Sequence, residues 1–344
     1  MTALLPGAFP GARGYLDTAT LGLPCPATLE ALAGVTRDWT AGRANAVAYD
    51  DDVRRSREAF GRLAGVPAAR VAAAGQVSSF VGLVAASLPA GARVLLPEGE
   101  FTSVLFPFLA RGDLDVRLAP LAGLADAVGA GTALVAFSAV QSADGAVADR
   151  SAITAAARAA GARTLVDVTQ SAGWMAIDAA SADYVVCGTY KWLLCPRGTA
   201  FLAGTEEALA VLPALHAGWY AGEDRWASIY GAPLRLAHDA RRLDLSPAWL
   251  CWAGTAPALE LIERLGVAAI GAHDVALAAA LRAAAGVPEN GSAIVSLPLD
   301  DAASARLRAA DVRFSVRDGR ARLAFHLYND ADDLGLVLDT LGLG

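Results

Sequence analysis

The chain has 344 residues, of which 55% are hydrophobic and 18% charged, a composition typical of folded globular proteins. Its net charge of −7 argues against nucleic acid as a partner, because binding to nucleic-acid phosphates needs a basic surface. The sequence has no apolar run of roughly 18 or more residues, and residues 1–14 lack the features of a secretion signal. We therefore expect a cytoplasmic protein that does not interact with a membrane.

The four cysteines form no C-x-x-C pair, and the four histidines show no spacing typical of metal ligands. We therefore predict neither a disulfide framework nor a bound metal.

Alanine-rich helical segments alternate with short β-branched runs over the first 200 residues or so. The predicted helices span residues 26–39, 52–64, 79–88, 103–111 and 150–160. The predicted strands span residues 70–74, 93–96, 116–118, 133–137, 164–167, 184–187 and 199–202. Because a helix separates most of these strands, the pattern predicts an α/β fold with one open, doubly wound and mainly parallel sheet.

The pattern changes after about residue 240. We predict a helix over residues 249–265, a strand at 294–297, a helix at 302–310, strands at 312–316 and 322–325, and a closing helix at 331–341. This order indicates a smaller α+β domain. Residues 219–245 are rich in tryptophan and tyrosine without clear periodicity, which favours a functional or interface loop.

Lys191 is the only lysine among the 28 basic residues, and all the others are arginines. Either residue can carry a surface charge, but a guanidinium stays protonated and cannot act as an amine nucleophile. The sequence therefore suggests a chemical role for Lys191. The alternative is that an arginine-rich coding background left one lysine by chance.

Polar residues follow two neighbouring predicted strands. Asp167 ends the strand T-L-V-D, and Lys191 follows the strand Y-V-V-C-G. Ligands of open α/β sheets bind at the carboxyl ends of the strands. An acid that keeps a pyridine nitrogen protonated, together with an amine for a carbonyl group, suits pyridoxal phosphate (PLP).

This cofactor also needs a phosphate site and a partner for its ring. The segment Ala73 to Phe80 passes from a strand through Gly75 into a helix, where the N–H groups of Val77 and Ser78 favour a phosphate. Phe101, after the next strand, can lie flat on the pyridine ring. Each signal has a structural alternative, since such a serine is more often a helix cap and such a phenylalanine more often part of the core.

With these features the chain resembles the class V aminotransferase family of fold-type I PLP enzymes, which includes cysteine desulfurases, isopenicillin N epimerase-like proteins and kynureninase. The matching stretches are Y-L-D-T-A-T-L-G at 15–22, G-Q-V-S-S at 75–79, V-D-V-T-Q at 166–170, G-T-Y-K-W-L at 188–193 and R-L-A-F-H-L-Y-N at 322–329. The resemblance implies a large PLP-binding domain over residues 21–240. It implies a small domain made from residues 1–20 and 241–344.

The resemblance also implies roles for single residues. Lys191 matches the Schiff-base lysine, and Asp167 matches the partner of the pyridine nitrogen. Gln170 matches the donor to the ring hydroxyl, and Phe101 the stacking aromatic residue. The other matches are phosphate contacts at Val77, Ser78 and Thr189, and the arginine for the substrate carboxylate at Arg322.

One position departs from the pattern of the family. Ser142 stands where many members have an asparagine beside the ring hydroxyl. Gln141 is an alternative residue for that contact.

The resemblance further implies a homodimer. Ser246, in R-R-L-D-L-S-P, matches a small polar residue that contacts the cofactor phosphate of the other subunit. The alternative is that Ser246 caps the following helix, with Pro247 in its first turn.

We expect an enzyme that acts on an amino acid and removes its Cα proton with Lys191. An aminotransferase is our first expectation, with a β-eliminating carbon–sulfur lyase and an amino-acid epimerase as alternatives. A non-catalytic PLP-binding module is a further alternative, because a fold alone does not establish activity. We do not expect a thiol-dependent desulfurase. The resemblance places the nucleophilic cysteine of those enzymes on a loop shortly before the carboxylate-binding arginine, and no cysteine lies between Val312 and Arg322.

Overall fold

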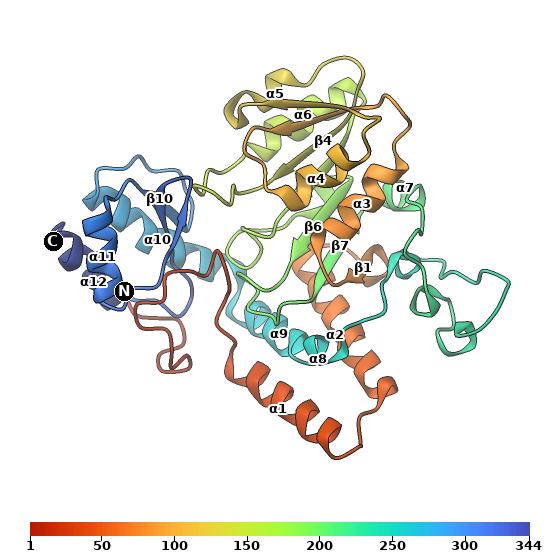
Figure 1. Cartoon of the computed structure of the whole chain (residues 1–344), viewed down its shortest axis with the longest axis horizontal. Coiled ribbons are helices and arrows are strands. Elements are labelled where there is room, and N and C mark those ends of the chain that lie inside the picture. The colour runs from red at the N-terminus through yellow and green to blue at the C-terminus, as the bar shows by residue number, and fades with distance from the viewer.

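A seven-stranded sheet forms the centre of the larger part of the protein in the computed structural model, which describes residues 1–344 (Figure 1). The strands run in the order β1-β7-β6-β5-β4-β2-β3, and only β7 is antiparallel to its neighbours. The prediction of a mainly parallel sheet is confirmed. The strands are β1 (Val71–Ala74), β2 (Arg93–Pro97), β3 (Asp115–Ala119), β4 (Thr132–Ser138), β5 (Arg163–Asp167), β6 (Tyr184–Gly188) and β7 (Ala200–Gly204).

Helices cover both faces of this sheet (Figure 1). The helices of this part are α1 (Pro26–Thr40), α2 (Ala46–Ala64), α3 (Val77–Ser87), α4 (Thr102–Ala110), α5 (Leu124–Ala127), α6 (Arg150–Ala160), α7 (Glu206–Ala210), α8 (Trp249–Ala253) and α9 (Thr255–Leu265). Of these, α2 to α6 contact the strands, whereas α1 packs on α8 and α9. Helix α2 begins earlier than predicted because the Asn45 side chain accepts a hydrogen bond from the Val47 N–H and caps it.

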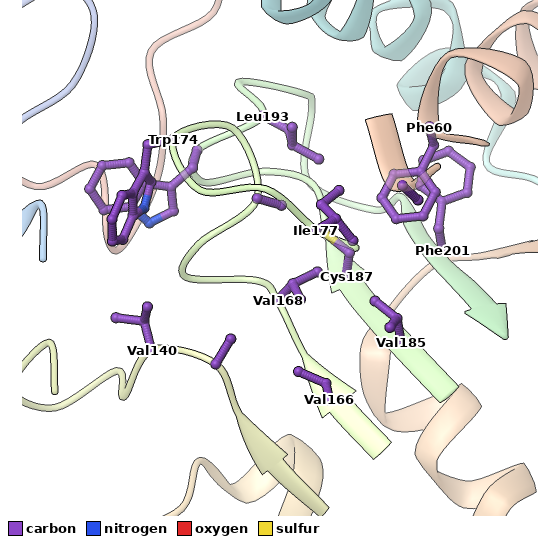
Figure 2. Packing of buried hydrophobic residues seen from close by; sticks show 14 of the residues in the cluster. Phe60, Val140, Val166, Val168, Trp174, Ile177, Val185, Cys187, Leu193 and Phe201 are labelled. Carbon is purple, nitrogen blue, oxygen red and sulfur yellow. The ribbon is translucent and has the colours of Figure 1, made fainter. Parts of the chain in front are cut away.

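The strands of the large sheet are buried on both faces. Neighbouring side chains alternate between two apolar clusters, so that Val166 and Val185 lie in one cluster while Leu165 and Val186 lie in the other. Figure 2 shows part of the first cluster, including Val166 from β5 and Val185 from β6. This packing fixes the direction and register of the strands, and so the positions of the residues that follow them.

The predicted helix over residues 249–265 is two helices, α8 and α9, which meet at Gly254. A Cβ atom at Gly254 would lie 2.7 Å from the Pro196 ring, so a side chain at this position would disturb the close packing there. Both helices pack on α2, where Arg62 forms an ion pair with Glu263. Residues 249–265, which we expected in the small domain, thus pack through α8 and α9 on α2, a helix of the larger part.

A second sheet of three antiparallel strands lies to one side of the large sheet, beside the N-terminal segment (Figure 1). The N-terminal segment is joined to this part by main-chain hydrogen bonds. The Leu4 N–H donates to the Leu327 carbonyl, and the Leu16 N–H donates to the Arg313 carbonyl. The strand predicted at residues 312–316 starts only at Ser315. The elements are α10 (Val267–Ala284), β8 (Ile294–Leu297), α11 (Asp301–Ala309), β9 (Ser315–Arg317), β10 (Arg320–Ala324) and α12 (Ala331–Leu341).

Helix α10 has the length and hydropathy of a membrane span. Here it packs on the small sheet, with Leu277 and Leu281 in the apolar cluster beneath that sheet. It also carries the buried polar residues His273, Asp274 and Arg282. These contacts are those of a core helix of the small part.

Candidate active site

A cavity of about 230 Å³ lies at the carboxyl ends of β4, β5 and β6. The sequence predicted a ligand site at these strand ends. Most of the residues that line it are polar. Of the predicted site residues, Val77, Phe101, Ser142, Asp167, Gln170 and Lys191 line the cavity, whereas Ser78, Thr189, Ser246 and Arg322 do not.

Lys191 follows β6 and is almost fully buried. Its Nζ atom lies 5.4 Å from the centre of the Phe101 ring and 5.7 Å from that of Tyr190. Burial lowers the pKa of Lys191 to about 8, and the charge of Arg322 lowers it further, although Asp167 acts in the opposite direction. A substantial fraction of the amine is therefore neutral near pH 8, as a nucleophile or a base requires.

The main chain of Lys191 is held by a neighbouring segment. The Gly22 N–H donates to the Tyr190 carbonyl over 2.9 Å. A Cβ atom on Gly22 would lie 2.1 Å from the Lys191 carbonyl oxygen, so only glycine fits at this position. The segment around Gly22 thus fixes the lysine-bearing loop.

Asp167 is the last residue of β5 and is buried. Its Oδ1 atom accepts a hydrogen bond of 2.8 Å from the Thr169 N–H. Burial raises the pKa of Asp167 to about 6, and the negative charge of Glu100 raises it further, against the lowering effect of Thr169 and Lys191. A buried carboxyl group of this kind suits a partner that brings a positive charge, such as a protonated ring nitrogen.

The start of α3 borders the cavity through Val77, the first residue of the helix, and through Gly75 and Gln76 just before it. No side chain caps this helix, so its first N–H groups are available to a ligand. With the positive end of the helix dipole, they form a site for an anion such as a phosphate.

Thr189 does not reach the cavity, contrary to our expectation. Its hydroxyl group is fully buried and bonds to the hydroxyl of Thr199 over 2.5 Å and to the carbonyl of the same residue over 3.0 Å. The flanking Gly188 and Tyr190 line the cavity instead. Ser78 also lies outside the lining, one residue beyond Val77 in α3.

Ser142 and Gln170 lie together at the side of the cavity. The Gln170 Nε2 atom donates to the Ser142 Oγ and the Ala19 carbonyl, both over 3.0 Å, and its Oε1 atom accepts from the Trp192 indole. Gln141, the alternative to Ser142, turns away and donates to Glu100. Ser142 is therefore the residue of this pair that can meet a ligand.

Arg322 lies behind Ser142 and is only 1% exposed. Its Nη1 atom donates to the Ser142 carbonyl over 2.5 Å, and its Nη2 atom donates to the Thr20 hydroxyl over 2.6 Å. Asp17 is the nearest carboxylate, 3.6 Å away, and the Arg322 Nε atom has no partner. Burial lowers the pKa of Arg322 to about 10, and the charge of Arg317 adds to this effect. A carboxylate can reach this arginine only if Thr20 or Ser142 moves.

The sequence did not identify Glu100 as part of the site. This buried carboxylate accepts hydrogen bonds from the Phe101 N–H, the Ser138 N–H and hydroxyl, and the Gln141 amide. It therefore links Phe101 to the end of β4. The criterion that singled out Asp167 and Lys191 would also have found Glu100, because it is a polar residue shortly after the end of β2.

The cysteines lie away from this chemistry. None lines the cavity, and Cys25, Cys187 and Cys195 are buried. Burial raises the pKa values of the Cys187, Cys195 and Cys251 thiols, which keeps them in the unreactive protonated form.

The residues present fit pyridoxal phosphate. The cavity combines one buried amine with a lowered pKa, a buried carboxyl group, an exposed aromatic ring and a free helix N-terminus. The amine suits the aldehyde of the cofactor, and the carboxyl group suits its ring nitrogen. The aromatic ring suits the face of the pyridine ring, and the helix N-terminus suits the phosphate.

The comparisons with known proteins agree with a site for pyridoxal phosphate. The family model described as Aminotransferase class-V matches residues 90–286. The chain is 27% identical over 309 residues to YcbU, an uncharacterized aminotransferase of Bacillus subtilis, and the alignment covers 83% of this chain and 82% of YcbU.

Two other relatives align over a shorter length. The isopenicillin N epimerase of Streptomyces clavuligerus is 30% identical over 247 residues, which cover 64% of this chain and 61% of the epimerase. The kynureninase of Deinococcus radiodurans is 33% identical over 237 residues, which cover 62% of this chain and 57% of the kynureninase. The chain thus spans less than two thirds of these two relatives.

Solved structures share the whole fold. A mutant of C-DES with glycine covalently linked to its PLP cofactor superimposes with a TM-score of 0.86 at 20% identity, covering 98% of this chain and 99% of C-DES. A cysteine desulfurase from Thermococcus onnurineus NA1 gives a TM-score of 0.82, also at 20% identity, with 96% and 94% covered. The protein belongs to the class-V aminotransferase family, has the fold-type I architecture, and is an enzyme whose cofactor is pyridoxal phosphate.

Proposed function

We propose that this enzyme is an aminotransferase of α-amino acids in which Lys191 is the single base. The observation that carries the proposal is that Lys191 is the only amine in the cavity, and that burial brings its pKa to about 8. Among the relatives, YcbU aligns over most of both chains, and its name is that of an aminotransferase.

When bound, pyridoxal phosphate supplies an aldehyde that condenses with amines and a ring that withdraws electrons from the Cα of the substrate. Lys191 would hold the aldehyde through its amine, and the neutral amine would take the proton from the substrate Cα and release it again from the resulting ammonium group. Asp167 would hold the ring nitrogen in its protonated form.

A single base favours transamination over epimerisation. Transamination moves one proton along one face, whereas epimerisation delivers a proton to the face opposite the base that removed it. Apart from Lys191 and Asp167, the ionisable side chains of the lining are Tyr190 and Arg197. Burial raises the pKa of Tyr190, so this phenol stays protonated near neutral pH and cannot remove the Cα proton, as the reverse direction of an epimerisation requires.

Arg322 binds the α-carboxylate of the substrate in this proposal. Its guanidinium can form two parallel hydrogen bonds to a carboxylate, which orients the Cα–H bond as well as holding the substrate. Because Thr20 and Ser142 occupy both Nη atoms, the substrate has to take over at least one of these hydrogen bonds.

The experiment is a single turnover with a panel of amino acids and S-substituted cysteines, in which the cofactor form and the products are measured together. The proposal predicts the amino form of the cofactor and one equivalent of keto acid. Pyruvate and ammonia with the aldehyde form of the cofactor restored would instead establish the β-eliminating lyase. Loss of optical activity without a keto acid would establish the epimerase.

We also propose a cytoplasmic homodimer with shared active sites. Ser246 is exposed and lies outside the cavity of its own chain. It adjoins an apolar hollow lined by Trp39 and Trp249. In the segment of residues 219–245, which is rich in tryptophan and tyrosine, Tyr230 is 87% exposed. Such apolar surface favours an interface. Light scattering should show a dimer, and a monomer that retains PLP tightly would refute the shared site.

A further inference from the structure

Arg197 is the one arginine that lines the cavity, and its side chain has no polar partner. It lies on the loop between Lys191 and β7, is exposed, and lines the cavity beside Tyr190 and Thr199. No hydrogen bond or ion pair involves its side chain. Arg322, in contrast, is engaged by Thr20 and Ser142.

The loop that carries Arg197 meets the loop before α3. The carbonyl oxygen of Gly198 lies 3.7 Å from the Cβ position of Gly75. Gly75, Gln76 and Val77 lead into the uncapped first turn of α3 and line the same cavity. Arg197 therefore borders the end of the cavity where free N–H groups favour an anion.

The guanidinium of Arg197 rests on an aromatic ring. Its central carbon lies 5.1 Å from the centre of the Tyr190 ring, a cation–π distance. Tyr190 directly precedes Lys191 and is fixed by the hydrogen bond from the Gly22 N–H to its carbonyl. Stacking limits the freedom of Arg197 and leaves the edges of its guanidinium available to an anion.

A phosphate group brings about two negative charges to this end of the cavity. The hydroxyl groups that we expected to contact it, those of Ser78 and Thr189, lie outside the lining. The N–H groups of α3 are neutral, and Lys191 is needed for the aldehyde. Arg197 is the remaining cation in the lining.

We propose that Arg197 binds the phosphate of pyridoxal phosphate from within the same chain, supported by the Tyr190 ring. A guanidinium and a phosphate form paired, charge-assisted hydrogen bonds that neutral donors do not match. The proposal depends on the cofactor and not on which reaction the enzyme catalyses. It is compatible with a contact from Ser246 of a second subunit.

The experiment compares two forms of the cofactor on the full chain. After removal of bound cofactor with hydroxylamine and dialysis, the protein is titrated with pyridoxal phosphate or with pyridoxal, which lacks the phosphate, and the dissociation constants are read from absorbance. The variants are Arg197→Gln, which removes the charge, and Arg197→Lys, which keeps the charge but loses the planar group. Arg117→Gln is the control, since Arg117 is an exposed arginine of β3 outside the cavity.

We expect Arg197→Gln to weaken the binding of pyridoxal phosphate about 10- to 100-fold, the range typical of a hydrogen bond to a charged group, and to change pyridoxal binding by less than about 3-fold. Arg197→Lys should fall between wild type and Arg197→Gln, and Arg117→Gln should match the wild type. Equal weakening of both ligands, or no weakening of pyridoxal phosphate, would overturn the proposal. If Arg197→Gln does not fold, Arg197→Lys decides: a wild-type ratio of the two affinities would count against the proposal.

Discussion

The cavity and Arg322 behind it are built in different ways, and we call them the cofactor end and the substrate end of the active site. Asp167 and Lys191 follow the central strands β5 and β6, whose register is fixed by apolar packing on both faces of the sheet. Arg322 lies on β10 of the small sheet and is covered by two residues from other segments, Thr20 and Ser142. The cofactor end is therefore preorganised, whereas the substrate end is closed by polar contacts that have to be exchanged.

This difference assigns different tasks to the two ends. Residues at the cofactor end hold charges and a base at fixed points, so substitutions there should change the rate of the chemical step. In the proposed reaction, residues at the substrate end decide how readily a carboxylate enters, so substitutions there should change KM more than kcat. The predictions below test this division, beginning with the largest effect.

Lys191→Arg should lower kcat by at least about 10³-fold, because the guanidinium keeps the positive charge but cannot accept the Cα proton. The protein should still fold and bind pyridoxal phosphate weakly through its phosphate. Steady-state kinetics together with thermal unfolding would test this. Retention of more than a tenth of the wild-type kcat would show that another residue is the base.

Asp167→Asn should lower kcat about 10²- to 10³-fold, because the ring nitrogen loses its anionic partner. The same change should stabilise the cofactor-free protein near pH 7 by roughly 2 to 3 kcal/mol, since the folded-state pKa of about 6 lies above the unfolded value of 3.8.

The pH dependence of that stabilisation has a definite sign. Asp167 is protonated in both states below about pH 3.8 and ionises more readily in the unfolded state as the pH rises, so it destabilises the fold fully only above about pH 6. The gain from Asp167→Asn should therefore vanish near pH 4. Denaturant unfolding at pH 4 and pH 7 measures it, and an equal gain at both values would contradict burial as the cause.

Arg322→Lys should raise KM about 10- to 100-fold, because an ammonium group cannot form the paired hydrogen bonds to the substrate carboxylate. The affinity for pyridoxal phosphate should stay within about 3-fold of the wild type, since Arg322 lies outside the cofactor end. Kinetics and cofactor titration on the same preparation separate the two effects. A large loss of cofactor affinity with unchanged KM would reverse the assignment.

Thr20→Val should have the smallest effect. It removes the hydroxyl that occupies the Nη2 atom of Arg322, so the substrate carboxylate meets less competition, and KM should fall about 2- to 5-fold. Stability should fall by about 1 kcal/mol, because a buried donor loses its partner. Initial rates and thermal unfolding test both parts. An increase in KM would show that Thr20 helps to bind the substrate.

The sequence predicted the cofactor end best, because residues directly after buried strands have few possible positions. Asp167 and Lys191 both reach the cavity as expected. The sequence is less informative where the chain leaves the strand: the Thr189 side chain turns into the protein, and its neighbour Tyr190 lines the cavity. Adjacent positions in a loop point in different directions, and sequence spacing alone does not say which.

Residues that act through long-range contacts were the hardest to identify. Arg197 is one arginine among many, and only the approach of its loop to Gly75 gives it a place in the site. The covering of Arg322 by Thr20 joins residues that are 302 positions apart. Both depend on tertiary packing.

The titration of Lys191 itself shows most directly whether this residue can be the base. Because the chain has one lysine, protein labelled with [ε-¹⁵N]lysine gives a single side-chain NMR signal. In the cofactor-free protein this signal should titrate with a midpoint near pH 8, since burial lowers the pKa of Lys191 to about 8. A midpoint near the ordinary value of about 10.5 would contradict the assignment of Lys191 as a buried amine poised to act as the base.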